Sequence, residues 1–287
     1  MAHPQIAAFA RLAEGSAKPA RKVEGQKSLL SRVMHSIVYD SVHDEIVVPQ
    51  YFAQAILTFR GAANGEEPPL RVIQGALTQL RIPDRLDVDP VHDEIFVPQG
   101  DSVLVFSRTA IGNVAPIRVL KGFPENLEAE AVGVDPVHNV LVVGMSGTRS
   151  ERGQLGGRPE QGRERKRETF LYIYSRTDQG DVKPRALIGG PKSQLKGIAG
   201  PFAVYPPREE IIVPIRGLNG VLSSDADFVG VWSTKDNGDV PPRWTIGGPH
   251  GALQHVHGVA INPQHKEIII ADKRSNSVLT YYFPEMF

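Results

Sequence analysis

One spacing of glycine, proline and leucine, Gly-x3-Pro-x5-Gly-x4-Leu, occurs five times in this chain, and no insertion interrupts any copy. The copies begin at Gly15, Gly65, Gly112, Gly180 and Gly238. A period of about fifty residues, with turn-forming residues at fixed offsets, is typical of repeat architectures such as propellers. A residue that recurs at one place in every repeat is therefore interpreted first as structural.

A second element alternates with this one. It consists of a short apolar run, a turn that is often Asp-Pro or Asn-Pro, and a second apolar run, which together predict a β-hairpin of strands A and B. Its copies span 38–49 and 88–98 and begin again at 134, 204 and 261. The glycine–proline element predicts another hairpin, of strands C and D, whose strand C carries an aromatic residue: Phe9, Phe59, Phe106, Tyr174 and Trp232.

Four antiparallel strands per repeat describe a propeller blade, so we expect an all-β propeller that forms a single domain over residues 1–287. The chain begins with a C–D hairpin and ends with an A–B hairpin and one more C-like strand, 277–283. Five blades are favoured, with N-terminal strands completing the last blade, so that 6–11 and 277–283 compete for one C position. The alternative is six blades, with a missing A–B hairpin upstream of Met1 or supplied by another chain. An unpaired strand is an open edge, which predicts self-association or strand exchange.

The last repeat carries a family resemblance. Its Gly258-Val-Ala-Ile-Asn, Glu267-Ile-Ile-Ile-Ala-Asp and Asn276-Ser-Val-Leu-Thr-Tyr segments resemble an NHL-type propeller repeat over residues 258–281. The other repeats resemble it less, because Pro49, Pro98 and Pro214 stand where that family has Ala-Asp. The resemblance implies a propeller fold, and it leaves protein binding, RNA binding and enzymatic activity open.

Composition narrows the function. Lysine plus arginine equals aspartate plus glutamate, at 32 each, so no global field gathers nucleic acid or an anionic membrane, and a nucleic-acid partner is not expected. The absence of cysteine excludes disulfides, thiolate metal sites and cysteine nucleophiles. No signal peptide or membrane span is recognised. This predicts a cytoplasmic protein by default, or a secreted one if a leader has been removed.

Two segments exceed the repeat. The first, at 145–169, has seven basic and four acidic residues and predicts a flexible charged loop between strands B and C. The second, at 216–228, also lies between strands B and C. Both should therefore emerge on one face of the propeller, which is a reasonable surface for a partner.

Histidines and acids form two recurring sets. His43, His92, His138 and His265 occupy the same A–B turn and are interpreted as turn or packing residues. Five residues before the turn Asp or Asn, where strand A begins, the repeats carry His35, Asp84, Glu130, Gly200 and His257. Imidazole and carboxylate together suit Zn, Fe, Mn or Ni, so His35, Asp84, Glu130 and His257 are candidate ligands of one divalent transition metal. The alternative is that they line a wet channel.

Two functions stay open. The first is a non-catalytic propeller that binds a protein partner through its loop face and assembles with its own kind through the spare strand. The second is a metal-dependent hydrolase or lyase that takes a small ester or lactone at the mouth of the central channel. The charged insertion and the surplus strand favour the first, and the ring of candidate ligands favours the second. No catalytic residue and no organic cofactor are indicated.

Overall fold

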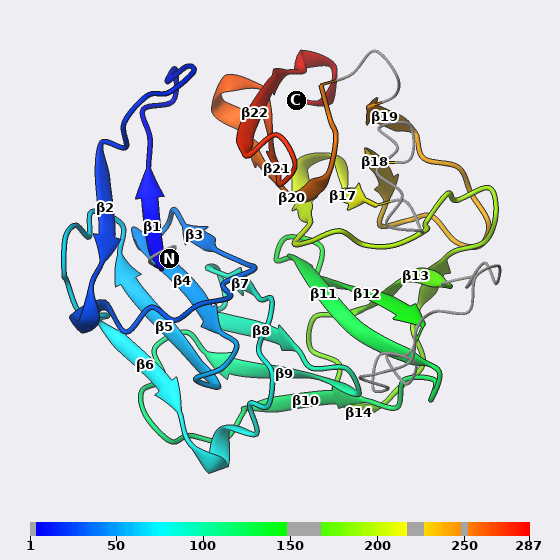
Figure 1. Ribbon diagram of the computed structural model, residues 1–287. Coiled ribbons are helices and arrows are strands. Elements are labelled where there is room, and N and C mark those ends of the chain that lie inside the picture. Colours follow the sequence, from blue (N-terminus) through cyan, green and yellow to red (C-terminus); the bar gives the residue numbers. More distant parts are fainter. Residues whose placement is uncertain (1–3, 148–167, 217–226, 248–251) are drawn as a thin grey trace, which may run out of the picture. The chain divides into compact units, whose positions relative to one another are not determined.

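The computed structural model describes residues 4–147, 168–216, 227–247 and 252–287 (Figure 1). The chain is all-β, and each helix described is a 3-10 turn of three residues: Gln26–Ser28, Ala76–Thr78, Pro206–Arg208, Pro263–His265 and Pro284–Met286. It divides into two compact units. The N-terminal unit comprises residues 1–96 and 105–117, and the C-terminal unit comprises 97–104 and 118–287.

In the N-terminal unit, two strands at the start of the chain pair antiparallel: β1 (Gln5–Ala8) and β2 (Arg21–Glu24). A four-stranded antiparallel sheet follows, in the order β3 (Val38–Asp40), β4 (Glu45–Gln50), β5 (Ala55–Arg60) and β6 (Arg71–Gln74). The next sheet contains residues of both units and has the same order, β7 (Asp87–Asp89), β8 (Glu94–Pro98), β9 (Ser102–Ser107) and β10 (Arg118–Lys121). The two-residue strand β14 (Gly180–Asp181) joins β10 in parallel.

Three sheets make up most of the C-terminal unit. The first has the order β11 (Leu127–Asp135), β12 (Val140–Gly147), β13 (Thr169–Ser175) and β15 (Ala186–Ile188). The second has the order β16 (Ala203–Tyr205), β17 (Glu210–Ile215), β18 (Phe228–Ser233) and β19 (Trp244–Gly247). The third has three strands, β20 (Val256–Asn262), β21 (Glu267–Asp272) and β22 (Ser277–Tyr282).

The strand roles agree with the repeat. Four sheets contain strands A to D in order, and the three-stranded sheet contains strands A to C. These five sheets correspond to the predicted blades, and β1 with β2 forms a sixth, two-stranded sheet. In the four sheets that have four strands or more, the second and third strands are almost wholly buried, because both faces of a blade contact other apolar residues. Their aromatic residues Phe59, Phe106, Tyr174 and Trp232 are each at most 1% exposed. These side chains contribute to the core, since burying an aromatic side chain stabilises by about 1.5–3 kcal/mol.

The last sheet selects one of the two segments that were expected to compete for its third position. Its third strand is β22, whereas β1 pairs with β2 in a separate two-stranded sheet. The N-terminal strands therefore do not take the third position of the last sheet. The physical reason is the cost of loop closure, since β22 follows β21 after a short turn that includes Asn276 in the left-handed region, whereas β1 is far away in sequence.

The first glycine of the repeated spacing joins each repeat to the one before. In four copies this glycine forms a parallel bridge to strand D of the preceding repeat: Val23 with Gly65, Ile73 with Gly112, Leu120 with Gly180, and Ile188 with Gly238. The bridge at Gly65 uses hydrogen bonds of 2.6 Å from its N–H to the Lys22 carbonyl and 3.0 Å from the Glu24 N–H to its own carbonyl. All four glycines have φ between 66° and 85°, which explains the residue type.

The residue after that glycine completes an inter-repeat clasp. In three repeats its side chain accepts a hydrogen bond from the backbone that follows the second glycine of the preceding repeat: Gln26 N–H to Glu66 (2.8 Å), Leu77 N–H to Asn113 (2.7 Å) and Lys192 N–H to Asp239 (2.7 Å). The second glycine must be glycine, because its φ is positive and a Cβ would collide with that side chain. At Gly75, φ is 130° and a Cβ would lie 2.5 Å from the Asn113 Oδ1 atom.

We predict that Asn113→Ala lowers the free energy of unfolding by about 1 kcal/mol, because the capping hydrogen bond of the clasp is lost. Gly75→Ala should cost more, because its φ of 130° strains any side chain even after Asn113 shifts. Urea denaturation measures both. Ser16 follows the glycine of the first copy, is exposed, and makes no described clasp, so Ser16→Ala is the matched control. Equal losses for Asn113→Ala and Ser16→Ala would contradict the role of the clasp.

Candidate functional site

Three of the four recurring histidines are structural. In the A–B turns, one carboxylate oxygen of Asp40, Asp89 or Asp135 accepts the backbone N–H groups two and three residues on, at 2.9–3.1 Å. The other oxygen contacts the Nδ1 atom of His43, His92 or His138, always at 2.8 Å. The fourth turn is different, since Asn262 donates instead to Glu267 (3.0 Å). These Asp–His pairs close the turns. The same pair occurs at the same position in three repeats, so the three histidines are spread over three turns and do not form one binding or catalytic site.

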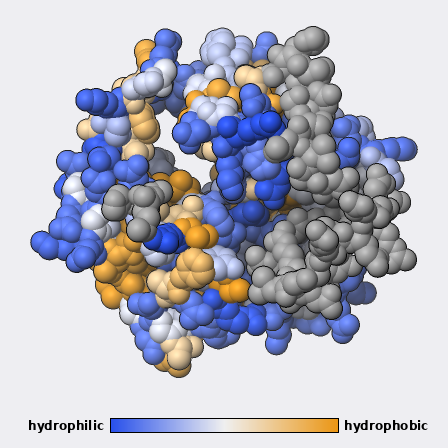
Figure 2. All heavy atoms as spheres, viewed as in Figure 1, coloured by the Kyte–Doolittle hydropathy of each residue, from blue (hydrophilic) through white to orange (hydrophobic). Residues whose placement is uncertain are grey.

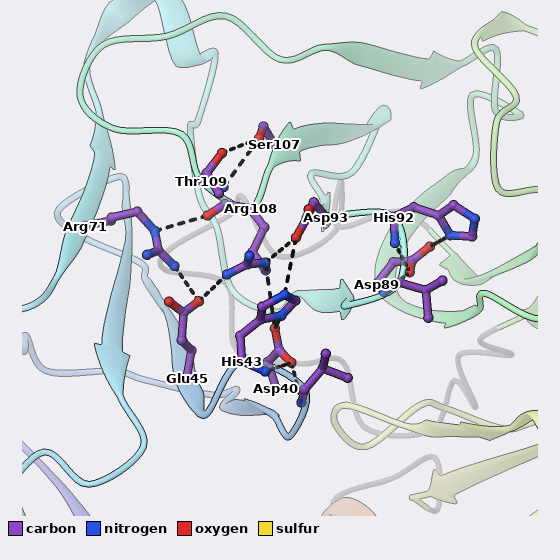
Figure 3. Close-up of polar contacts among 12 residues, drawn as sticks. Asp40, His43, Glu45, Arg71, Asp89, His92, Asp93, Ser107, Arg108 and Thr109 are labelled. Carbon is purple, nitrogen blue, oxygen red and sulfur yellow. Dashed lines mark hydrogen bonds and ion pairs between the residues drawn. The ribbon is translucent and has the colours of Figure 1, made fainter.

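Charged side chains of neighbouring repeats meet behind these turns in the N-terminal unit (Figure 3). The Glu45 carboxylate accepts hydrogen bonds from Arg71 and from Arg108, the latter at 2.7 Å. Arg108 also donates to Asp93 at 2.7 Å, and it is only 7% exposed. Burial lowers the pKa of Arg108, but its bonds to Asp93 and Glu45 outweigh burial, so the pKa is raised and the guanidinium stays charged. The cluster is a paired buried network that joins two sheets.

The predicted metal ligands fall into two groups. In the N-terminal unit, His35 and Asp84 meet, with the His35 Nδ1 atom 2.5 Å from the Asp84 Oδ1 atom and both side chains partly exposed. Arg85 lies 3.9 Å from the other Asp84 oxygen. Glu130 and His257 belong to the C-terminal unit. Among the residues that the structure describes, no group of three or more His, Asp or Glu is arranged to hold a metal. The four-ligand site stays a prediction, and the structure brings two of its residues, His35 and Asp84, into contact.

Gly200 interrupts the predicted ring for a steric reason. A Cβ at this position would lie 1.7 Å from the backbone carbonyl oxygen of His257, so no larger residue fits between the two segments. The Val259 N–H donates to the Pro201 carbonyl at 3.3 Å beside this contact. Two repeats therefore approach through their backbones here, and the glycine is a packing requirement rather than a missing ligand.

The segment before β20 is held by two buried carboxylates. Asp272 accepts the N–H groups of Gln254 (2.6 Å) and His255 (2.9 Å), and Asp227 accepts that of Val256 (3.2 Å). Asp272 also accepts N–H groups from the turn at Ser275. Burial raises the pKa of Asp272. The hydrogen bonds from the N–H groups of Ser275, Gln254 and His255 have the larger effect together and lower the pKa to about 2. This carboxylate therefore fixes the backbone that carries His257.

One feature of the N-terminal unit was missed by the sequence reasoning. At one end of its sheets, strand B connects to strand C, and strand D connects to strand A of the next sheet. We call this end the loop end. Its connections are 25–37, 51–54 and 75–86. The Gln54 side chain donates to the Arg81 carbonyl, and that of Gln74 to the Ala53 carbonyl, each at 2.8 Å. The connections that carry Phe52 and Ile82 are therefore adjacent.

These connections expose large apolar side chains, which we call the apolar loop patch: Leu29, Val33, Phe52, Leu77 and Ile82. Phe52 is 68% exposed. Leu29 ends a 3-10 turn in the left-handed region, where two other repeats place Gln79 and Gln194, so an apolar residue is not needed for the turn. Figure 2 shows apolar side chains gathered on the N-terminal unit at the lower left of the view. A large exposed apolar patch marks a binding surface more often than a scattered single residue does.

The two insertions belong to the C-terminal unit. They lie between β12 and β13 and between β17 and β18, which are B–C connections, as predicted. The structure describes only their flanks. Residues 145–147 and 169 belong to the paired strands, and the Gly147 N–H donates to the Glu168 carbonyl at 2.8 Å. Residues 148–167 and 217–226 lie outside the described residues.

Comparisons with known proteins identify the fold. No protein-family model matches the chain, and no curated protein matches it. A chain from the crystal structure of a nidogen/laminin complex superposes with a TM-score of 0.52 at 11% identity, covering 89% of this chain and 78% of that one. Hydrazine synthase of Kuenenia stuttgartiensis superposes with a TM-score of 0.58 at 10% identity, covering 94% of this chain and 68% of that one.

At these identities the likeness shows the fold alone. The prediction of an all-β, five-bladed β-propeller is confirmed. Membership of the NHL-type family is not shown. No helix in the described part of the chain is long and apolar enough to cross a membrane.

We predict that Asp272→Asn lowers the free energy of unfolding at pH 7 by about 2 kcal/mol, because the ionised carboxylate binds several backbone N–H groups more strongly than an amide does. The folded-state pKa of about 2 lies below the usual 3.8, so this stabilisation is present above about pH 4 and is lost as the pH falls toward 2. Chemical denaturation of the wild type and the variant measures their difference in free energy of unfolding, which should be smaller at pH 3 than at pH 7. Glu14→Gln, in an exposed turn, is the control, and a difference that stays constant between the two pH values would contradict the assignment.

Proposed function

We propose that this chain is a non-catalytic β-propeller that binds a protein partner through its loop end. The apolar loop patch is the observation that carries the proposal. Phe52, Leu77 and Leu29 are more than half exposed at one end of the N-terminal unit. Removing such side chains from water stabilises a complex by about 25 cal/mol per Å² of apolar surface, before the costs of association.

The partner is a protein with an apolar surface. The three connections that form the patch contain four basic residues and one acidic residue, Asp84, which contacts His35. Three of the basic residues, Lys27, Arg32 and Arg81, are exposed, whereas Arg85 is buried beside Asp84. This composition favours a partner with carboxylates around its apolar contact, because complementary charges steer association. One similar structure is that of a nidogen/laminin complex, which agrees with a binding role for the fold.

We also propose that the repeats are of the NHL type. The support is the last repeat, where the Ala271-Asp272 pair ends strand B and Asp272 caps the segment before strand A. In three other repeats, proline takes the alanine or aspartate position within a buried strand B: Pro49, Pro98 and Pro214. The proposal therefore rests on one repeat.

A second candidate is the metal-dependent hydrolase or lyase for a small ester or lactone, with its ligand in the channel. The His35–Asp84 contact is the observation that favours it, because a carboxylate orients an imidazole in many metal and catalytic sites. A divalent Zn, Fe, Mn or Ni would be its cofactor. The binding proposal is preferred, because the Asp40–His43 pair and its equivalents close turns and the Glu45–Arg108 pair connects two sheets.

The binding proposal predicts that Phe52→Ser/Leu77→Ser abolishes retention of a partner, because the variant loses most of the apolar contact at the loop end. Tagged full-length chain is exposed to an extract of its source cells, and retained proteins are quantified by mass spectrometry. Val42→Ser/Val91→Ser is the control, since these residues are similarly exposed but lie on the A–B turns at the opposite end. The same retained proteins in both variants would refute a role for the loop end.

The enzymatic candidate is tested by elemental analysis of untagged protein that has been purified without chelator, together with a screen of lactones and esters. We expect wild type, His35→Ala and the control His265→Ala to contain the same trace metal and to show no turnover. About one equivalent of a transition metal in wild type and His265→Ala, lost in His35→Ala, would reverse the order of the two proposals.

A further inference from the structure

In the sheet of β3 to β6, strand B begins with a glutamate whose carboxylate is held by two arginines. Glu45 accepts hydrogen bonds from Arg71, on strand D of the same sheet, and from Arg108, which follows strand C of the next sheet (Figure 3). Arg71 also donates to the backbone carbonyl of Arg108 at 3.2 Å. Two guanidinium groups of the chain itself therefore compensate this buried carboxylate.

The same three positions in the C-terminal unit carry a glutamate and two aromatic residues. The strand pairing establishes the equivalence, because each of these residues has the backbone partner that its counterpart in the N-terminal unit has. The counterparts are Glu210 for Glu45, Trp244 for Arg71 and Phe283 for Arg108. The glutamate of the repeat is therefore kept here, whereas both arginines are replaced by aromatic side chains.

The carboxylate of Glu210 is buried and only partly satisfied. The residue is 2% exposed, and its Oε1 atom lies 3.5 Å from the Nε atom of Arg208, which also donates to the Glu285 carbonyl. No hydrogen bond reaches the Oε2 atom within the described part of the chain. Burial raises the pKa of Glu210, and the charges of Arg208 and Arg243 offset this only in part. A further donor at Oε2 would therefore stabilise the ionised carboxylate.

Two aromatic rings accompany this carboxylate. The register of β17, β18 and β19 places Glu210 and Trp244 on one face of their sheet, because side chains at paired and alternate positions share a face. Phe283, after the last sheet, contacts Trp244 with ring centroids 5.2 Å apart and ring planes at 89°. Both aromatic residues are only half-buried. The faces of aromatic rings attract cations, and tryptophan does so most strongly.

We propose that Glu210, Trp244 and Phe283 form a binding site for a guanidinium group. The Oε2 atom accepts its N–H groups, and the rings supply faces on which a planar cation stacks. A quaternary ammonium has no N–H to donate, and the ammonium group of lysine is compact and more strongly hydrated. A guanidinium is also the group that contacts the equivalent Glu45. The site goes beyond the proposed loop-end function and uses none of the residues of the apolar loop patch.

An NMR titration of the full-length chain tests the site, because the chain has only two tryptophans. Addition of N-acetyl-argininamide should shift the indole N–H signal of Trp244, which is identified with Trp244→Phe. The signal of the fully buried Trp232 should stay in place. N-acetyl-citrullinamide has nearly the same shape without the charge, and it should shift neither signal. No shift with argininamide, or equal shifts with both compounds, would exclude recognition of a guanidinium.

Variants assign the binding to the carboxylate. Glu210→Gln should weaken the affinity for N-acetyl-argininamide about tenfold or more, because a charged acceptor is lost. Glu267→Gln is the matched control, since Glu267 has the same position in the last sheet but accepts a hydrogen bond from Asn262 at 3.0 Å. It should bind as the wild type does. An unchanged affinity in Glu210→Gln, measured by calorimetry, would overturn the proposal.

A second variant keeps the test decisive if Glu210→Gln does not fold. Trp244→Arg restores the arginine that contacts Glu45 in the first sheet, so it should fold, pair with Glu210 and lose affinity for N-acetyl-argininamide. Wild-type affinity in this variant would contradict the site. Free arginine and the peptide acetyl-glycyl-arginyl-glycinamide distinguish the two sources of the group. Tighter binding of the peptide indicates an arginine side chain of a protein, and tighter binding of free arginine indicates a small molecule.

Discussion

The structure depends on one polar contact between successive repeats, the clasp between a glycine turn and the strand before it. A residue such as Asn113 caps the backbone behind Gly75, while Gly112 bridges Ile73. Gly75 and Gly112 both have positive φ values, which favour glycine. Gly75 also leaves room for the Asn113 side chain, which a Cβ would displace. Apolar burial alone allows sheets to slide on one another. The clasp fixes the register between neighbours, and the core then packs on it.

The same logic explains why much of the charged chemistry is structural. Asp40, Asp89 and Asp135 each hold a histidine and two backbone N–H groups in identical geometry. Glu45 and Arg108 connect two sheets. Buried charges are tolerated because each has a partner, and removal of one partner leaves the other uncompensated at a cost of about 3–5 kcal/mol. In a repeat protein, a polar pair that recurs is therefore part of the scaffold, and function belongs to positions that depart from the repeat.

Much of the fold could be predicted from the sequence, because glycine and proline spacing is a local property and the repeat multiplied the signal. The five sheets, their strand order and the B–C location of both insertions followed from it. The candidate site could be predicted only in part. The contact of His35 with Asp84 is consistent with the predicted ring, whereas the backbone contact that requires Gly200 was not visible. The third strand of the last sheet was left open between 6–11 and 277–283, because its pairing is decided by loop-closure entropy and not by residue type.

The apolar loop patch could not be predicted from the repeat for a simpler reason. Leu29 is apolar where two other repeats place glutamine in the same turn, Gln79 and Gln194. The turn itself therefore accepts a polar residue, and nothing in the repeat spacing distinguishes the apolar choice. The apolar loop patch has a chemistry that the repeat does not require, and this favours a different protein as its partner.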